Sequence, residues 1–193
     1  MAERTSGNRS DWACVVLAAG AGTRMNSRIP KPLHTLGGKS IVSHVLNAAK
    51  SAGVGPITLL HDGSGTLPEA IGEPYQYAVQ QERDGTGGAV RSALQSFGDS
   101  PPRMLMVLNG DTPFVSSESI RALAEIGDTG DAVMAVLGSE EALSSGLGVL
   151  TIANDGSVEA IIEAGDQIEA TLDPVNVGAY SFDVEWLTAH LSR

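Results

Sequence analysis

Residues 17–38 read LAAGAGTRMNSRIPKPLHTLGG, a glycine-rich and basic stretch in a chain that is otherwise acidic. It overlaps the end of the apolar run WACVVLAA (residues 12–19), whose short length and closing glycine predict a buried β-strand. A loop after such a strand lies at its carboxyl end, where open α/β sheets bind their ligands. Glycines there let backbone N–H groups approach a polyanion closely, and Arg24 and Lys31 add positive charge. The stretch therefore predicts a phosphate-binding loop.

The charge balance limits the kind of partner. The 193 residues include 12 basic and 23 acidic side chains, for a formal net charge of −11. Extended nucleic-acid binding needs a broad basic face, which this composition does not favour. Four of the basic residues nevertheless fall between positions 24 and 39: Arg24, Arg28, Lys31 and Lys39. We therefore expect a small anionic ligand and no nucleic-acid partner.

Length and hydropathy favour one domain over residues 12–193, preceded by a polar tail over residues 1–11 (MAERTSGNRSD). The tail lacks the apolar segment of a signal peptide, and no apolar run is long enough to cross a membrane. The lone Cys14 lies in the predicted first strand and excludes a disulfide within the chain. These features predict a cytoplasmic protein that has no membrane partner.

Strand-like and helix-like segments alternate, which predicts an α/β fold with a mostly parallel central sheet and helices on both faces. Ser40 is expected to cap one helix and Ser116 or Ser117 another, and Asn154-Asp155-Gly156 predicts a hairpin turn. The expected helices cover residues 41–53, 86–97, 118–127 and 184–191. The expected strands cover residues 12–19, 56–62, 75–80, 104–111, 131–138, 148–153, 157–164 and 174–183.

The glycine loop does not follow the two commonest phosphate-binding patterns. After Gly20 and Gly22, a dinucleotide loop would have a third glycine where Met25 stands, and a Walker loop would continue as Gly-Lys-Ser/Thr. An ordinary turn without a ligand is the alternative explanation. Pro30 and Pro32 fix the backbone around Lys31, which lowers the entropy lost when its ammonium group binds.

Asp111 is the candidate metal ligand. It follows the most apolar predicted strand, in a Gly-Asp-Thr-Pro turn at the same edge of the sheet as the glycine loop. Mg²⁺ prefers one or two carboxylates together with phosphate oxygens, which the loop would hold nearby. A turn or helix-capping aspartate is the alternative.

Further polar residues follow other predicted strands. The Gln80 amide can both donate to and accept from a nucleobase edge, while Gly85 and Thr86 would let a base approach the backbone. Glu163 and Asn176 suit sugar hydroxyl groups. The alternative for Gln80, Gly85 and Thr86 is that they form the start of a helix without binding a ligand. The alternative for Glu163 and Asn176 is that they are ordinary polar residues at strand ends.

Taken together, the motifs resemble those of the sugar-1-phosphate nucleotidylyltransferases, in particular the uridylyltransferase domains of bifunctional uridylyltransferase/acetyltransferases. The resemblance runs from Trp12 to Leu191. Its blocks are LAAGAGTRM, PKPLHTLGGKSIVSHVL, QQERDGTGGAV, NGDTPFV, GLG, AIIEAGD and VNVGAYSFD. The resemblance implies a three-layer, Rossmann-like nucleotidyltransferase fold.

The resemblance also implies an activity: uridylyl transfer from UTP to a hexosamine 1-phosphate, in particular N-acetylglucosamine 1-phosphate, with release of pyrophosphate. The product would be a UDP-sugar precursor of the cell wall. The residues implied to bind the nucleotide are Leu17, Ala18, Ala19, Gly20, Gly22, Gln80, Gly85 and Thr86. Arg24 and Lys31 would act in catalysis, Asp111 would hold Mg²⁺, and Gly148, Glu163 and Asn176 would bind the sugar.

Several positions depart from the family pattern. An aromatic residue is usual where Asn109 stands, Tyr and Arg where Leu147 and Val149 stand, and a lysine near Gly165. The family's second metal ligand would fall beyond residue 193, so we expect a shortened or a compact member. Two alternatives to the uridylyltransferase follow. One is a compact transferase of the molybdenum-cofactor type, with another nucleotide or a non-sugar acceptor; the other is a nucleotide-binding module without catalysis.

Overall fold

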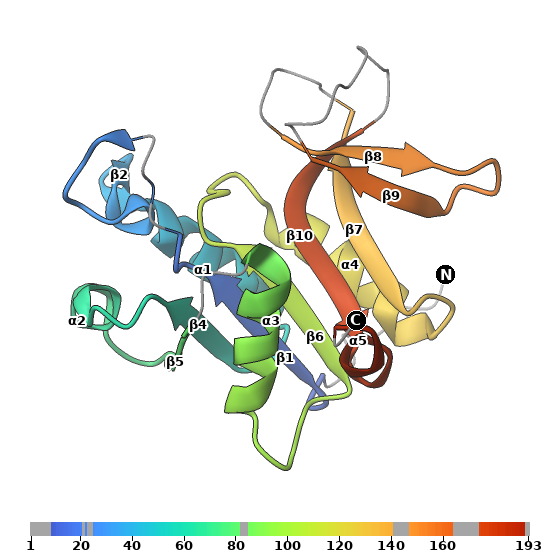
Figure 1. Ribbon diagram of the computed structural model, residues 1–193, viewed down its shortest axis with the longest axis horizontal. Helices are drawn as coiled ribbons and strands as arrows, with labels where there is room; N and C mark the ends of the chain where they lie inside the picture. The colour runs from blue at the N-terminus through green and yellow to red at the C-terminus, as the bar shows by residue number, and fades with distance from the viewer. Residues whose placement is uncertain are drawn as a thin grey trace.

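A central β-sheet with helices on both faces organises the chain (Figure 1). The computed structural model describes residues 9–20, 22, 25–81, 85–140, 147–163 and 174–191. The helices are α1 (Ile41–Ala52), α2 (Thr66–Ile71), α3 (Gly85–Ser96), α4 (Ser117–Thr129), α5 (Val184–His190) and the short 3-10 helix η2 (Lys31–Leu33). The strands are β1 (Trp12–Leu17), β2 (Thr35–Leu36), β3 (Lys39–Ser40), β4 (Ile57–His61), β5 (Gln76–Val79), β6 (Met104–Asn109), β7 (Met134–Ser139), β8 (Val149–Ile152), β9 (Val158–Ile162) and β10 (Val175–Asp183).

Among the described residues, the strands of the main sheet lie in the order β5–β4–β1–β6–β10–β8–β9, and β7 also pairs with β10. Strand β1 pairs in parallel with β4 and β6, and β4 pairs in parallel with β5. The register places Leu17 beside both Leu60 and Asn109, so these strands end at the same level. Their carboxyl ends therefore form one edge on which the loops after β1, β5 and β6 can meet.

Strand β10 changes the direction of the sheet. It pairs antiparallel with β6, β7 and β8, and β8 pairs antiparallel with β9. Strands β7 and β8 consequently point the same way as β1, while β9 and β10 point the opposite way. The β8–β9 turn is the predicted hairpin at residues 154–156, with Gly156 at φ +84° and the Asp155 carboxylate accepting from the Ser157 backbone. The predicted α/β class with a mostly parallel sheet is confirmed.

The two faces of the sheet carry separate apolar cores. Helices α1 and α4 cover one face through side chains such as Val45 and Leu123, which pack with Cys14 and Met106 of the sheet. Helices α3 and α5 cover the other face, where Val90 and Leu187 pack with Val15 and Leu105. Alternate residues of β1 and β6 thus enter opposite cores, which explains why β1, and β6 as far as Leu108, are apolar.

Helix ends follow the predicted capping signals. The Ser40 hydroxyl accepts from the Ser43 backbone N–H at the start of α1, and Gly53 ends that helix at φ +71°. The Ser116 hydroxyl accepts from the Ser119 backbone N–H at the start of α4. These caps satisfy backbone donors that have no partner within the helix.

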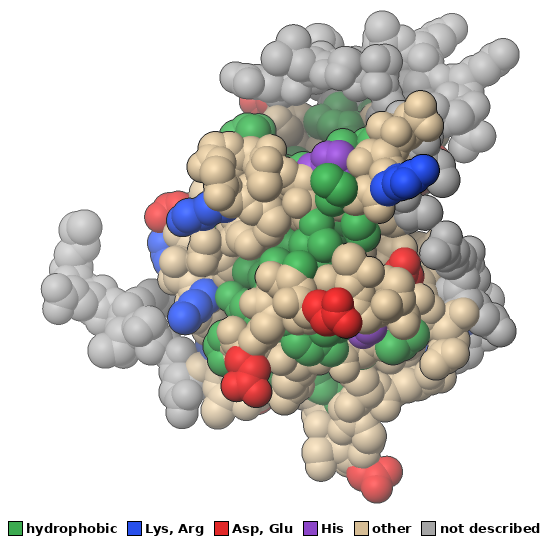
Figure 2. Space-filling view, turned by 90° about the vertical axis from the view of Figure 1, so that its left-hand side faces the viewer, with side chains coloured by type: hydrophobic (Ala, Val, Ile, Leu, Met, Phe, Trp, Pro, Cys, Tyr) green, Lys and Arg blue, Asp and Glu red, His purple; other side chains and the backbone are tan. Residues whose placement is uncertain are grey.

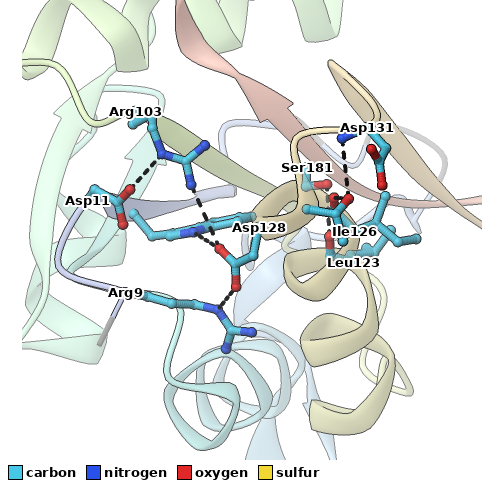
Figure 3. Close-up of polar contacts among 10 residues, drawn as sticks. Arg9, Asp11, Arg103, Leu123, Ile126, Asp128, Asp131 and Ser181 are labelled. Atoms are coloured by element: carbon cyan, nitrogen blue, oxygen red, sulfur yellow. Dashed lines mark hydrogen bonds and ion pairs between the residues drawn. The ribbon is translucent and has the colours of Figure 1, made fainter. Parts of the chain in front are cut away.

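An ion-pair cluster ties the segment before β1 to the rest of the fold (Figure 3). The Asp128 carboxylate in α4 accepts from Trp12 Nε1 at 2.8 Å and pairs with Arg9 at 3.0 Å. Arg103, just before β6, pairs with Asp11 at 2.6 Å and holds the pKa of that carboxyl below its usual value. Of the predicted polar tail, residues 9–11 therefore contact the sheet and α4, while residues 1–8 lie outside the described part of the chain.

The surface on the side of α2 and β5 is mixed in character. Figure 2 shows apolar side chains along the middle of this face, with Lys and Arg side chains dispersed around them. Within the described ranges, none of the helices has the length and apolar character required to span a membrane.

Candidate nucleotide-binding site

A cavity of about 380 Å³ lies at the carboxyl ends of β1, β5 and β6. We call it the nucleotide cleft. Most of its lining residues are ones that the sequence predicted for the nucleotide, for its phosphates or for the metal ion: Leu17, Ala18, Ala19, Gly20, Lys31, Gln80, Gly85, Thr86 and Asp111. Pro32, Ala89 and Asn109 complete the lining. Arg24 lies outside the described residues.

Gly22 does not line the cleft, but it shapes the wall that carries Lys31. Its φ is +58°, and a Cβ atom at this position would lie 2.7 Å from Cβ of Lys31. Only glycine allows the loop to pack so closely against the lysine. Pro30 precedes the short helix η2, which begins at Lys31 and fixes the backbone from which the ammonium group extends.

Lys31 and Asp111 meet inside the cleft. Lys31 Nζ lies 2.5 Å from Asp111 Oδ2, and the two side chains are 38% and 35% exposed. The pair joins the loop after β1 to the turn after β6, which places a cation and a carboxylate side by side at the sheet edge. A phosphate group would bind the lysine, and a divalent cation would bind the aspartate.

Asp111 fits Mg²⁺ only together with a phosphate ligand. In the described part of the chain, no three His, Cys, Asp or Glu side chains lie close enough together to hold a metal ion. Mg²⁺ usually retains several waters and binds through one or two carboxylates plus substrate phosphates. A single carboxylate beside a phosphate-binding lysine meets that requirement.

The opposite wall of the cleft comes from β5 and α3. The Gln80 backbone N–H donates to the His61 carbonyl, which continues the β4–β5 pairing, and Gln80 Nε2 lies 3.4 Å from the Gly85 carbonyl. Gly85 and Thr86 form the first turn of α3, and both line the cleft. The positive end of the helix dipole therefore faces the cavity and favours an anionic ligand.

A second cavity, of about 330 Å³, shares Thr86 with the nucleotide cleft and lies between α3, β10 and α5. We call it the β10 cavity. The predicted sugar-binding residues Glu163 and Asn176 line this cavity and not the cleft. The third, Gly148, accepts a hydrogen bond from the Asn176 backbone N–H at 2.8 Å, so the structure brings the three together. Most of the remaining wall is apolar, and it includes Trp186 stacked on His190.

A bulge in β10, between Asn176 and Tyr180, contacts lining residues of both cavities. Asn176 Nδ2 donates to the Tyr180 hydroxyl at 2.7 Å, and Asn176 Oδ1 accepts from the Gly178 backbone N–H at 3.0 Å. Burial raises the pKa of Tyr180, the nearby Glu163 carboxylate raises it further, and the hydrogen bond from Asn176 partly offsets both effects. Gly178 has φ +80°, and a Cβ atom there would overlap the Asn109 amide.

Of the three cleft residues that the site prediction did not include, Asn109 is the polar one. It is the last residue of β6, at the level of Leu17, and it precedes the Gly110-Asp111 turn. Its place directly before a predicted metal ligand, at the end of the most apolar strand, was the available signal.

These features define an α/β protein with a cleft at the carboxyl edge of its parallel strands, where Lys31, Asp111 and the first turn of α3 meet. Residues 14–169 match the family described as the MobA-like NTP transferase domain. The chain belongs to this family of nucleotidyltransferases.

Similarity to individual proteins agrees with the family. The bifunctional protein GlmU of Mycobacterium avium is 37% identical over 195 residues, which cover 95% of this chain and 39% of that protein. GlmU of Rhodococcus opacus is 36% identical over 196 residues, covering 94% of this chain and 39% of that protein. The chain thus spans about two fifths of the length of these curated relatives. The resemblance to sugar-1-phosphate nucleotidylyltransferases is confirmed.

A solved structure supports the fold. A putative glucose-1-phosphate thymidylyltransferase from Bacillus anthracis, in complex with sucrose, superimposes with a TM-score of 0.76 at 20% identity. The match covers 91% of this chain and 73% of that chain.

Proposed function

We propose that this domain transfers a uridylyl group from UTP to a hexosamine 1-phosphate, in particular N-acetylglucosamine 1-phosphate. A phosphate oxygen of the sugar phosphate attacks the α-phosphorus of UTP, the bond from that phosphorus to the bridging oxygen breaks, and pyrophosphate leaves. The juxtaposition of Lys31 and Asp111 at the carboxyl edge of β1 and β6 carries the proposal. The resemblance of the sequence motifs to those of uridylyltransferase domains, together with 37% identity to GlmU over 95% of this chain, supports UTP and the amino sugar as substrates.

The reaction needs no covalent intermediate, because the sugar phosphate is itself the nucleophile. Catalysis then depends on in-line placement and on charge neutralisation. The backbone from Ala18 to Gly20 and the first turn of α3 would hold the nucleotide between β1 and β5. Lys31, with Arg24 from the same loop, would stabilise the charge that grows on the leaving pyrophosphate.

Mg²⁺ is the proposed cofactor, and Asp111 is the residue that would hold it. When bound, the ion would neutralise negative charge on the phosphate oxygens of the substrate. Asp111 and Lys31 are both charged and partly exposed in their ion pair. When substrate binds, Asp111 would bind the metal ion and Lys31 a phosphate group, and neither step would bury an additional unpaired charge.

The β10 cavity is the proposed place for the sugar. Glu163 and Asn176 offer a carboxylate and an amide, and Gly148 allows the strand that ends before Glu163 to approach closely, because a Cβ atom there would lie 3.1 Å from the Ile162 carbonyl oxygen. The shared residue Thr86 brings this cavity next to the nucleotide cleft, as transfer between two bound substrates requires.

A transferase with another nucleotide or a non-sugar phosphate acceptor is the second candidate. The match to a MobA-like domain favours it, together with the departures of Asn109, Leu147 and Val149 from the residues that the resemblance to the sugar-1-phosphate family implies at these positions.

A pyrophosphate-release assay tests the proposal, with each of the four common nucleoside triphosphates against a panel of sugar 1-phosphates. The expected result is release that requires both UTP and a hexosamine 1-phosphate. Release with another nucleotide or acceptor would support the second candidate. Nucleotide binding without release from any pair would overturn the transferase proposal in favour of a binding module.

A further inference from the structure

We propose that Lys31 is an internal counter-ion, which keeps divalent cations off Asp111 until a phosphate group binds the lysine. The inference rests on the proposed function, because it concerns the metal site of that reaction. It adds an order to the binding events: the metal ion enters the cleft together with the nucleotide or after it.

The contact between the two side chains uses a group that a metal ion would need. Lys31 Nζ lies 2.5 Å from Asp111 Oδ2, so the ammonium group occupies one of the two oxygens through which this carboxylate could bind a cation. Among the described residues that line the cleft, Lys31 and Asp111 are the charged ones. A divalent cation at Asp111 would therefore meet a positive charge as close as the negative one.

The backbone around Lys31 limits how far its ammonium group can move away. Lys31 begins η2 between Pro30 and the buried Pro32. A Cβ atom at Gly22 would lie 2.7 Å from Cβ of Lys31, so the loop packs against the base of the side chain. Only the outer bonds of the lysine are left to rotate, and the ammonium group stays within the cleft whether it binds Asp111 or a phosphate group.

The effect on metal binding comes from repulsion and not from the strength of the ion pair. The two side chains are 38% and 35% exposed, so the pair itself is weak. A charge of +2 about 4 Å from the ammonium group is nevertheless repelled enough to lower its affinity about tenfold, even when salt screens the interaction. A phosphate group on Lys31 cancels this repulsion and adds oxygen ligands for the ion, so nucleotide and metal ion bind cooperatively.

The experiment measures Mn²⁺ binding to the protein without nucleotide, from the electron paramagnetic resonance signal of the unbound ion. Mn²⁺ takes the same carboxylate and water ligands as Mg²⁺. Lys31→Met keeps the length of the side chain and removes its charge, and we expect it to bind Mn²⁺ about tenfold more tightly than the parent. Lys39→Met, in the exposed strand β3, makes the same change in net charge and should bind like the parent. Lys31→Arg retains the positive charge and should also bind like the parent.

Two more variants locate the gain in affinity. Lys31→Met combined with Asp111→Asn should lose it, which would assign the bound ion to Asp111. Lys31→Ala repeats the test with a smaller side chain, and thermal unfolding checks that each variant is folded.

Three outcomes would overturn the inference: an unchanged Mn²⁺ affinity in folded Lys31→Met or Lys31→Ala, an equal gain in Lys39→Met, or a gain that persists in the double variant. The measurement requires no turnover. A parent protein that releases no pyrophosphate with any substrate pair would overturn the proposed function, while the Mn²⁺ affinities would still decide the role of Lys31.

Discussion

At the scale of single residues, Lys31 and Asp111 hold opposite charges in contact within a cleft open to solvent. Their side chains are each more than one third exposed, so the pair contributes little to folding stability. Exchanging it for a phosphate on the lysine and a cation on the aspartate therefore costs little. The two residues are better suited to binding than to holding the fold together.

Lys31→Ala should reduce kcat/KM for pyrophosphate release by about a hundredfold, because one group that stabilises developing charge is typically worth on the order of 3 kcal/mol. The melting temperature should stay close to that of the parent, since the ion pair is weak. Steady-state kinetics and thermal unfolding measure the two quantities. Lys50→Ala, in the exposed last turn of α1, is the control, and a kcat/KM of Lys31→Ala within threefold of the parent would contradict the assignment.

Removal of the metal should act through Asp111. The free protein should bind Mg²⁺ weakly, because one carboxylate is a poor site until substrate phosphates complete it. Titration calorimetry should show a lower affinity for UTP in the presence of EDTA than in the presence of Mg²⁺. In Asp111→Asn, most of this difference in affinity should disappear. Tight UTP binding that ignores both EDTA and the substitution would remove Asp111 as the metal ligand.

Lys31 and Asp111 could be predicted because each has a local signal: a lysine between two prolines after a glycine loop, and an aspartate after the most apolar strand. For Asn109 the local signal is limited to its place at the end of β6, directly before the Gly110-Asp111 turn, and it does not show what the side chain contacts. Its side chain gains its place from Gly178 of a distant strand, and the bulge that gives Gly178 its left-handed conformation forms only when β10 pairs with its neighbours. A contact of this kind depends on the tertiary structure, so a short sequence pattern cannot predict it.

At the scale of elements, periodicity and capping residues predict most of the helices and strands. They do not predict which strands lie next to each other or in which direction neighbouring strands run. The pattern predicts a strand at residues 174–183 and does not show that it inserts antiparallel between strands that run the other way. Helix α2 was not predicted, because its segment carries Gly65 at the start and Pro68 within the first turn, and no side chain caps it. Its place follows from Leu67, which packs into the same core as the buried residues of α1.

The contact of α4 with the sheet gives a stability prediction. A Cβ atom at Gly127 would lie 2.5 Å from Met104 Cε and 2.9 Å from Trp12 Cη2, so Gly127→Ala should lower the free energy of unfolding by about 1–3 kcal/mol through overpacking. Urea unfolding measures the change. Gly87→Ala in α3 is the matched control, since the nearest atom would be 3.8 Å away and alanine favours a helix. Equal stability of Gly127→Ala and the parent would show that Met104 moves aside without cost.

At the scale of the whole molecule, the sheet separates two cores, and the Asp128 cluster joins segments that are far apart in sequence. The Asp128 carboxylate in α4 accepts a hydrogen bond from Trp12 at the start of β1 and forms an ion pair with Arg9, which precedes that strand (Figure 3). Arg103, which precedes β6, places its Nη2 atom 3.8 Å from Oδ1 of the same carboxylate. The cluster lies at the amino ends of the parallel strands, opposite the nucleotide cleft. A role in stability is therefore separable from a role in catalysis.

Asp128→Ala should lower the free energy of unfolding by about 1–3 kcal/mol, because Trp12 Nε1 would lose its acceptor in a largely buried setting. Urea unfolding followed by tryptophan fluorescence measures the loss, and kcat/KM should remain near the parent value. Asp131→Ala, an exposed neighbour, serves as the control. Parent-like stability of Asp128→Ala would mean that the cluster makes no net contribution.

Strand β1 lies between β4 and β6, although β6 is formed by residues that follow it much later in the chain. During synthesis on the ribosome, β1 can therefore pair with β4 well before residues 104–109 emerge. Until then, one edge of a strand that is apolar on both faces has no partner, and such edges promote association between nascent chains. The arrangement that brings the two halves of the cleft together thus also sets the interval of biosynthesis in which this edge is open to association with other chains.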